Sequence, residues 1–210
     1  MNKTVIFGFV ALLAITGCKK SVTNNLSSEE TRVYITNRDG NVNFSDYKTY
    51  SLVDSVADIR SNGQTKSLSS ADAALLAAVR TEMNARGFVE VSKDDDPDLG
   101  LNVSKLDITI TNYVPEYYPG YWSGYDAYYD PYYWGYGGYD YYFPTFYRVY
   151  QYEVSSITID MVDLKNASAN NQLKIIWNAQ LEGDNILHPN AAATGVKAAF
   201  DQSAYLRAGN

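Results

Sequence analysis

The chain has 210 residues, a formal net charge of −7 at pH 7 and 46% hydrophobic residues. This length and composition suit a globular domain that buries a sizeable core, while the acidic balance gives no electrostatic footprint for nucleic acid. With a single cysteine and a single histidine, the chain cannot form an internal disulfide or a thiolate metal site, and we expect no metal and no cofactor.

Residues 1–17 have the pattern of a lipoprotein signal peptide. Lys3 gives a short positive start, and the apolar run Val5–Ile15 that follows is too short to span a bilayer. Residues 15–18, Ile-Thr-Gly-Cys, then resemble the lipobox of bacterial lipoproteins, in which the chain is cut before the cysteine and the cysteine is acylated. We therefore expect Cys18 to carry a lipid anchor; the alternative is an ordinary signal peptide with an incidental cysteine.

Residues 18–30 are polar and lack periodicity, which predicts a flexible tether between the anchor and the domain. The residue after the cysteine is Lys19 rather than aspartate, and this favours transfer to the outer membrane. An acidic run typical of surface export is missing, so we expect the periplasmic leaflet. The expected partner at this end of the chain is the membrane itself, through the lipid.

The first half of the domain predicts two strands and a helix. Residues 32–36 alternate weakly, as in an edge strand, and residues 44–53 are rich in aromatic and β-branched residues. Residues 54–67 are expected to form a loop. The strongest helix covers residues 69–86, where Ser69 and Asp72 form a capping box, Leu75, Leu76, Val79 and Met83 make an apolar stripe, and Gly87 ends the helix.

Two long strands are expected at residues 98–113 and 148–164, after a short strand at 88–91 and an aspartate-rich turn at 94–98. That turn lacks the ligand spacing of an EF-hand calcium loop. In each long strand the apolar residues change from one face to the other, which predicts β-bulges near Ser104–Lys105 and Ser155–Ser156. The two strands would form a bent antiparallel hairpin.

Residues 173–181 alternate strictly apart from Ile176, and they predict a buried strand paired with residues 157–163. A last helix is expected over residues 190–207. This order of elements predicts one α+β domain over residues 31–210: a two-layer sandwich with a mainly antiparallel sheet of four to six strands and two helices on one face. A common core is expected for Leu76, Val79, Met83, Ile159, Trp177 and Phe200.

The insert at residues 114–147 is the most unusual part of the sequence. Between Tyr117 and Tyr142, 12 of 26 residues are tyrosine, and no lysine or arginine occurs from Leu106 to Tyr147. Few aliphatic residues are available to build a core, so we expect the insert to add little to stability. Three interpretations stay open: a flexible or self-packed hairpin tip, a ligand surface for glycan or protein, and contact with lipid headgroups.

If the insert is a contact surface, its aromatic side chains would form it, and its partners would be peptidoglycan, another glycan or an envelope protein. The candidate contact residues are Tyr121, Trp122, Tyr125, Tyr128, Tyr129, Tyr132, Tyr133 and Trp134.

Enzymatic activity has weak support. No nucleophile, zinc, Walker or dinucleotide motif is present, and His188 precedes a proline in the loop before the last helix. Asp160 and Asp163 are the carboxylates that an envelope hydrolase would use for acid–base chemistry. A polar strand face and a turn-forming aspartate account for them better, and we expect a non-enzymatic binding or structural role.

Several segments in order resemble the bacterial lipoprotein family called domain of unknown function 4136. The resemblance rests on Phe44–Tyr50 (FSDYKTY), Arg86-Gly87-Phe88, Asp96–Leu99 (DPDL), Ile157–Asp163 (ITIDMVD) and Ile176-Trp177. It implies a small α+β domain behind a lipobox and brings no established activity. The chain departs from the family pattern at Leu52, near which tryptophan is common, and in the length of its tyrosine insert.

Overall fold

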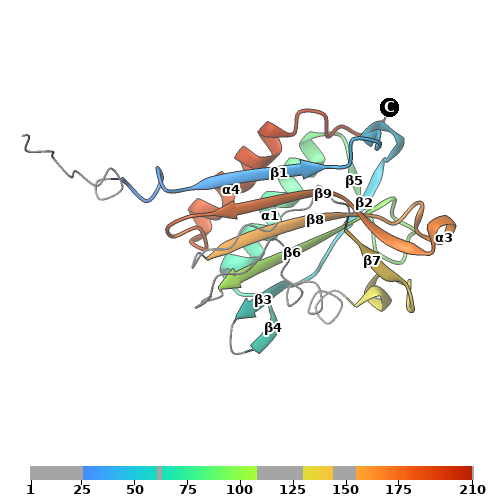
Figure 1. Cartoon of the computed structure of the whole chain (residues 1–210), viewed down its shortest axis with the longest axis horizontal. Helices are drawn as coiled ribbons and strands as arrows, with labels where there is room; N and C mark the ends of the chain where they lie inside the picture. Colours follow the sequence, from blue (N-terminus) through green and yellow to red (C-terminus); the bar gives the residue numbers. More distant parts are fainter. Residues whose placement is uncertain (1–25, 61–62, 108–129, 144–154, 210) are drawn as a thin grey trace, which may run out of the picture.

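The computed structural model describes residues 26–60, 63–107, 130–143 and 155–209. Within these residues the chain folds as an α+β structure, with a large twisted sheet and two main helices, α1 (Ser70–Ala85) and α4 (Pro189–Gln202), packed behind it (Figure 1). The expected α+β class is therefore confirmed. Cys18 lies outside the described residues, as does most of the tether.

The sheet is larger and more mixed than the sequence suggests, with nine strands in the described part of the chain rather than four to six. Its main path runs in the order β1 (Val33–Arg38), β9 (Gln172–Glu182), β8 (Ser156–Asp163), β6 (Leu99–Asp107), β2 (Thr49–Leu52) and β5 (Val89–Glu90). Off this path, β3 (Val56–Arg60) pairs with β4 (Gly63–Ser67) and β6, and β7 (Asp140–Tyr142) pairs with β9.

The centre of the sheet is antiparallel, as expected, but four strand pairs are parallel. The β1–β9, β9–β8 and β8–β6 pairs are antiparallel, whereas β2–β6, β3–β6, β2–β5 and β7–β9 run parallel. The expectation of a mainly antiparallel sheet misses the effect of α1, which lies between β2 and β6 in sequence. A helical crossover returns the chain in the same direction, so the strands that flank it pair in parallel.

The β3–β4 hairpin replaces the loop expected over residues 54–67. Val56 and Ala57 of β3 are fully buried, and β3 extends the sheet beside the second half of β6. The segment is short and mostly polar, so its alternation is too weak to mark two strands. Its strand character comes from pairing with β6 rather than from propensity.

The expected hairpin of the two long strands is confirmed, but the bulge at Ser104–Lys105 is not. The register of β6 and β8 continues without a break from Leu99 opposite Asp163 to Leu106 opposite Ser156. Both faces of β6 are buried, so the apolar residues can change face without an extra residue. The second bulge is expected near Ser155–Ser156, at the start of β8. Because residues 144–154 lie outside the described part, this bulge stays a prediction.

The break in alternation at Ile176 marks the bulge that the structure does contain. Met161 is opposite Trp177 and Val162 is opposite Ile175, so Ile176 is the extra residue of β9. Its carbonyl accepts a hydrogen bond from the backbone N–H of Asp39 at 2.9 Å. The bulge therefore ties β9 to the chain just after β1.

Both helices begin, and α1 also ends, where local chemistry predicts. Ser69 and Asp72 form a reciprocal capping box at the start of α1, and Gly87 follows its end with a φ of +87°, which favours glycine. Pro189 occupies the first turn of α4. The helix ends at Gln202, earlier than expected.

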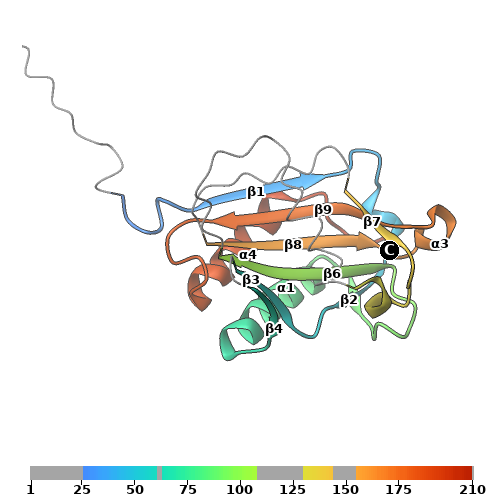
Figure 2. The same cartoon turned by 60° about the horizontal axis from the view of Figure 1, so that its bottom comes forward.

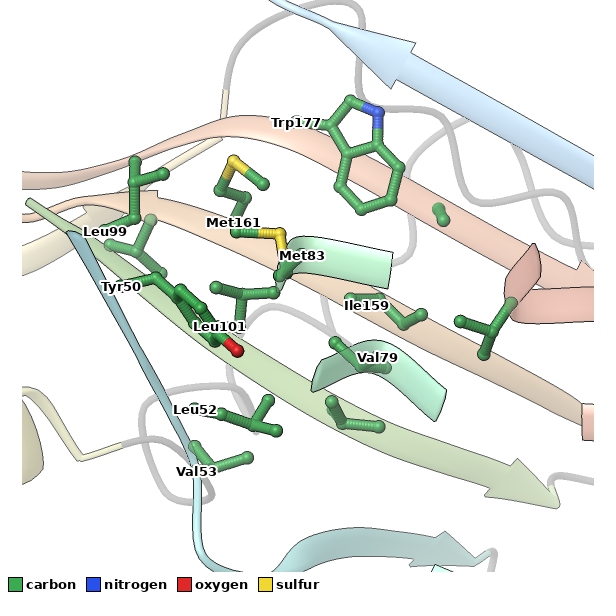
Figure 3. Close-up of a cluster of buried hydrophobic side chains, with 14 of the residues drawn as sticks. Tyr50, Leu52, Val53, Val79, Met83, Leu99, Leu101, Ile159, Met161 and Trp177 are labelled. Atoms are coloured by element: carbon green, nitrogen blue, oxygen red, sulfur yellow. The ribbon is translucent and has the colours of Figure 1, made fainter. Parts of the chain in front are cut away.

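The core lies between the helices and one face of the sheet. Figure 3 shows Val79 and Met83 of α1 beside Leu101, Ile159 and Met161 of the sheet. Trp177 of β9 lies next to Phe200 of α4, with ring centroids 5.1 Å apart. All six residues expected to share a core are buried within this cluster, and Figure 1 shows α1 and α4 on the same side of the sheet.

Candidate functional site

The described part of the tyrosine insert, residues 130–143, forms a compact unit that we call the aromatic corner. It comprises the single-turn helix η3 (Pro131–Trp134), a glycine-rich turn and β7. Figure 2 shows it at the end of the sheet opposite the start of β1. Of the candidate contact residues, Tyr121, Trp122, Tyr125, Tyr128 and Tyr129 lie outside the described residues, so only three can be placed.

Local sequence explains how the corner folds. The Asp130 carboxylate accepts a hydrogen bond from the backbone N–H of Tyr132 at 2.9 Å, and Pro131 occupies the first turn. Gly135 ends the turn with a φ of +81°, in the left-handed region. Strand β7 then adds to the start of β9, an edge that, among the described residues, β1 leaves unpaired because it pairs only with the later residues of β9.

Trp134 fixes the corner to the sheet. Its side chain is only 4% exposed and belongs to the core cluster, so it is a packing residue rather than a surface contact. The indole lies so close to Gly100 of β6 that a Cβ at this position would be 2.9 Å from the ring atom Cζ2. Glycine is thus the residue that lets the ring approach the strand. The expectation that the whole insert adds little to the core is wrong for this residue.

Tyr133 and Tyr136 hold the corner through their polar tips. The backbone N–H of Asp54 donates to the Tyr133 hydroxyl at 3.3 Å, and the Tyr136 hydroxyl donates to the carbonyl of Leu164 at 2.9 Å. Burial raises the pKa of both phenols, and the Asp54 carboxylate raises that of Tyr133 further. Both side chains are half-buried supports, so Tyr133 offers only part of its ring to a ligand.

Tyr132 is the candidate that faces outward. Its side chain is 74% exposed. A Cβ added at Gly137 would overlap the Tyr132 ring, so the ring lies directly on the glycine backbone. The arrangement holds a flat aromatic surface in place with its outer side in solvent.

The two candidate catalytic carboxylates are not brought together. Asp160 and Asp163 are three residues apart on β8, and strand alternation directs them to opposite faces of the sheet. Asp163 accepts hydrogen bonds from the Tyr47 hydroxyl at 3.0 Å and from the Asn166 side chain at 2.8 Å. Asp160 is fully buried and accepts one from Asn178 at 2.7 Å. Both carboxylates are engaged in structural hydrogen bonds.

Sequence reasoning missed a buried polar cluster on the sheet face opposite the helices. The side chains that form it come from the three central strands: Asn102 and Ser104 of β6, Thr158 and Asp160 of β8, and Asn178 and Gln180 of β9. All are at most 3% exposed, and the Ser104 and Thr158 hydroxyls lie 3.0 Å apart. The only signal in the sequence is the run of even-numbered polar positions, which is equally typical of a strand face in solvent.

A charged cluster closes the end of the sheet near the start of α1. Lys105 forms ion pairs with Asp72 at 2.7 Å and with Asp58 at 3.5 Å, and Asp58 is also paired with Arg60. These residues line a cleft of about 220 Å³. Burial raises the pKa of Asp72, but hydrogen bonds from Lys105, Ser69 and Ser67 outweigh it and lower the pKa to about 2.

Replacing this carboxylate should make stability less dependent on acid pH. Because the pKa of Asp72 is lower in the folded chain than its ordinary value of 3.8, the charge stabilises the fold fully above about pH 4 and the contribution is lost as pH falls towards 2. We expect Asp72→Asn to cost about 1.5–3 kcal/mol near pH 7, the range for hydrogen bonds to a charged group. Urea unfolding at pH 7, 4 and 2.5 measures the difference, and a difference that does not shrink on acidification would contradict this assignment.

The described residues offer neither a metal site nor a membrane span. No group of three or more His, Cys, Asp or Glu side chains there could hold a metal ion. No helix in the same ranges is long and apolar enough to cross a bilayer.

The comparisons with known proteins agree on the family. The model of the domain of unknown function DUF4136 matches residues 35–203. The chain belongs to this family. A solved DUF4136 family protein from Bacteroides thetaiotaomicron VPI-5482 is 30% identical, with a TM-score of 0.68 over 84% of this chain and 98% of that chain. The resemblance seen in the sequence is thereby confirmed.

Other solved structures are more distant from this DUF4136 chain. A PelC dodecamer from Paraburkholderia phytofirmans is 12% identical, with a TM-score of 0.40 over 84% of this chain and 98% of that chain. A PDZ domain protein from Parabacteroides distasonis ATCC 8503 is 12% identical, with a TM-score of 0.46 over 83% of this chain and 36% of that chain. These likenesses are too weak to support a functional argument. No curated protein matches the sequence.

Proposed function

We propose that this DUF4136 chain is a lipid-anchored protein of the bacterial cell envelope that binds a partner rather than catalysing a reaction. The tyrosine insert would be its contact surface, and the partner would be peptidoglycan, another envelope glycan or an envelope protein. The anchor would be Cys18, in the periplasmic leaflet of the outer membrane.

One observation carries the proposal. The aromatic corner is fixed to the sheet by Trp134, yet it holds Tyr132 in solvent at 74% exposure. Tyrosine loses little conformational entropy on binding and combines an apolar face with a polar tip, which is why it is common in recognition surfaces. A rigid support for an exposed ring lowers the cost of ordering that surface when a partner binds.

The anchoring part of the proposal predicts how the chain partitions. The wild-type protein should enter the detergent phase of a phase-separating detergent and incorporate labelled fatty acid. Cys18→Ala should remain uncleaved by the lipoprotein signal peptidase and lose the label, because the acylated sulfur is missing. Acyl labelling of the Cys18→Ala protein would contradict the assignment of the anchor.

The binding part is tested by removing aromatic side chains while keeping the corner. We expect a variant with serine at five positions, Tyr121, Trp122, Tyr125, Tyr128 and Tyr129, to lose most binding to purified sacculi or to its envelope partner. Co-sedimentation with sacculi and affinity capture from envelope fractions are the measurements. The variant retains Trp134, so its unfolding midpoint should stay close to that of the wild type.

The matched control replaces exposed apolar residues elsewhere. Leu68 and Val89 are 61% and 58% exposed, and neither is aromatic. Leu68→Ser with Val89→Ser removes exposed apolar surface outside the insert and should leave binding unchanged. Full binding both by the five-position variant and by a variant that also carries Tyr132→Ser would reject the tyrosine insert as the contact surface.

A further inference from the structure

The aromatic corner is preorganised for stacking. Trp134 and β7 attach the corner to the sheet, and the Tyr136 hydroxyl donates a hydrogen bond to the Leu164 carbonyl. These three contacts restrain the backbone of the corner. Part of the Tyr132 ring lies against Gly137, and the side chain as a whole is 74% exposed. A flat ring held in this way is suited to another flat apolar surface, and it needs no rearrangement to receive one.

The charges around the corner disfavour an anionic ligand. Asp130 and Asp140 are exposed on the corner itself, and the sequence has no lysine or arginine from residue 106 to 147. Two lysines come from other elements and lie over the Tyr133 ring: Lys66 at 5.6 Å and Lys93 at 5.7 Å from its centroid. Lys93 is also paired with Asp94 at 2.8 Å. The surface therefore offers carboxylates that accept hydrogen bonds, and its described residues form no cationic groove of the kind that binds phosphate polymers.

The position of the corner disfavours the lipid headgroups of the anchoring membrane. The described chain enters the sheet at Val33, opposite Glu182 of β9, whereas the corner joins at Asp140, opposite Gln172. These points are ten residues apart on β9, or about 33 Å at about 3.3 Å per residue. A domain tethered through its N-terminus would thus carry Tyr132 at its far end, as the opposite positions of β1's start and β7 in Figures 1 and 2 indicate.

We infer that Tyr132 is a stacking site for an uncharged polysaccharide, an inference that rests on the proposed function and names its ligand class. The C–H face of a pyranose ring stacks on the exposed side of the tyrosine ring. Asp130 and Asp140 accept hydrogen bonds from sugar hydroxyls beside it. The site lies at the end of the domain far from the anchor, so it can contact a polymer that lies beyond the membrane surface.

The test uses the chain purified from membranes in a zwitterionic detergent that carries no sugar headgroup. Calorimetric titration with chitohexaose and cellohexaose should show binding of at least one of them. Tyr132→Ala should weaken that association at least tenfold, whereas Tyr132→Phe, which keeps the ring, should stay within twofold. Gly137→Ala, which displaces the ring while Tyr132 remains, should weaken it as Tyr132→Ala does, and Leu68→Ala should have no effect.

Three results would overturn the inference. The first is the absence of oligosaccharide binding, and the second is binding that is unchanged in Tyr132→Ala. The third is an association with polyphosphate, or with phosphatidylethanolamine–phosphatidylglycerol vesicles, that is stronger than the association with either oligosaccharide. The proposed function is distinguishable from this inference. If the wild type is still captured by an envelope protein through the five aromatic positions, binding stands as the function while the glycan site at Tyr132 is rejected.

Discussion

Trp177→Ala should be the most destabilising single substitution among the core residues of the sheet. The side chain is fully buried, and its ring packs on Phe200 of α4, so it joins the two layers of the fold. The indole N–H also donates to the Ser203 hydroxyl at 3.0 Å. Truncating a buried tryptophan leaves a cavity that the surrounding structure fills only in part, at a cost of about 3–5 kcal/mol.

Two companion variants separate packing from hydrogen bonding. Ser203→Ala removes the acceptor of the indole N–H and the long hydrogen bond from the Ser203 hydroxyl to the Tyr205 hydroxyl at 3.3 Å, and it should cost about 1–3 kcal/mol, mostly for the unsatisfied buried N–H. Leu68→Ala, at a position 61% exposed, should stay within about 0.5 kcal/mol of the wild type. Urea unfolding followed by circular dichroism gives the free energies. A loss below about 1 kcal/mol in Trp177→Ala would mean that α4 is not packed against β9 as described.

Trp134→Ala should have a comparable effect, about 3–5 kcal/mol, although the residue lies in a low-complexity insert. The side chain is 4% exposed, and its N–H has no hydrogen-bond partner among the described residues, so the loss would come from packing alone. Its neighbour Tyr132 provides the matched comparison, because it belongs to the same turn but is 74% exposed. Tyr132→Ala should change stability by no more than about 0.5 kcal/mol.

Gly100→Ala tests the contact between Trp134 and β6 by changing the strand residue instead of the tryptophan. The new methyl group would lie within 2.9 Å of the indole, so we expect overpacking to cost about 1–3 kcal/mol. Unfolding by urea is again the measurement. If Trp134→Ala proves as mild as Tyr132→Ala, the corner is not attached to the sheet through its tryptophan.

The parts of the fold that the sequence predicts well are those with local signals. The capping box of Ser69 and Asp72 and the glycine after α1 locate that helix within a residue at each end. The alternation of β9 predicts its pairing with β8, and the one break in that alternation, Ile176, is the bulge. In these segments each residue's preference agrees with its final environment, so short windows of sequence are sufficient.

The parts that it misses depend on partners distant in the chain. The strands β3 and β4 are short and β4 is entirely polar, so their strand geometry depends on pairing, of β3 with β6 and of β4 with β3. The parallel pairs β2–β6, β3–β6 and β2–β5 join strands that lie on either side of α1 in the chain, and no local pattern encodes this crossover. The bulge expected at Ser104–Lys105 assumes one solvated face, but both faces of β6 are covered, so a change of apolar face needs no extra residue there.

Composition predicts the candidate site as a segment, but not residue by residue. Tyrosine content marks the insert as unusual, yet it does not separate Trp134, which is buried, from Tyr132, which is exposed. Gly100 is the signal that could have helped, since a glycine inside a strand often marks a close approach. The identity of the approaching ring depends on tertiary contacts between segments that are distant in sequence.

The central claim is that this DUF4136 chain works by binding through its aromatic insert, and crosslinking in living cells tests it most directly. A photo-crosslinking amino acid in place of Tyr132 is compared with the same group in place of Leu68, which is similarly exposed but lies in the turn before α1. Irradiation should join position 132, and not position 68, to an envelope component. The absence of product at position 132, or equal products at both positions, would contradict the claim.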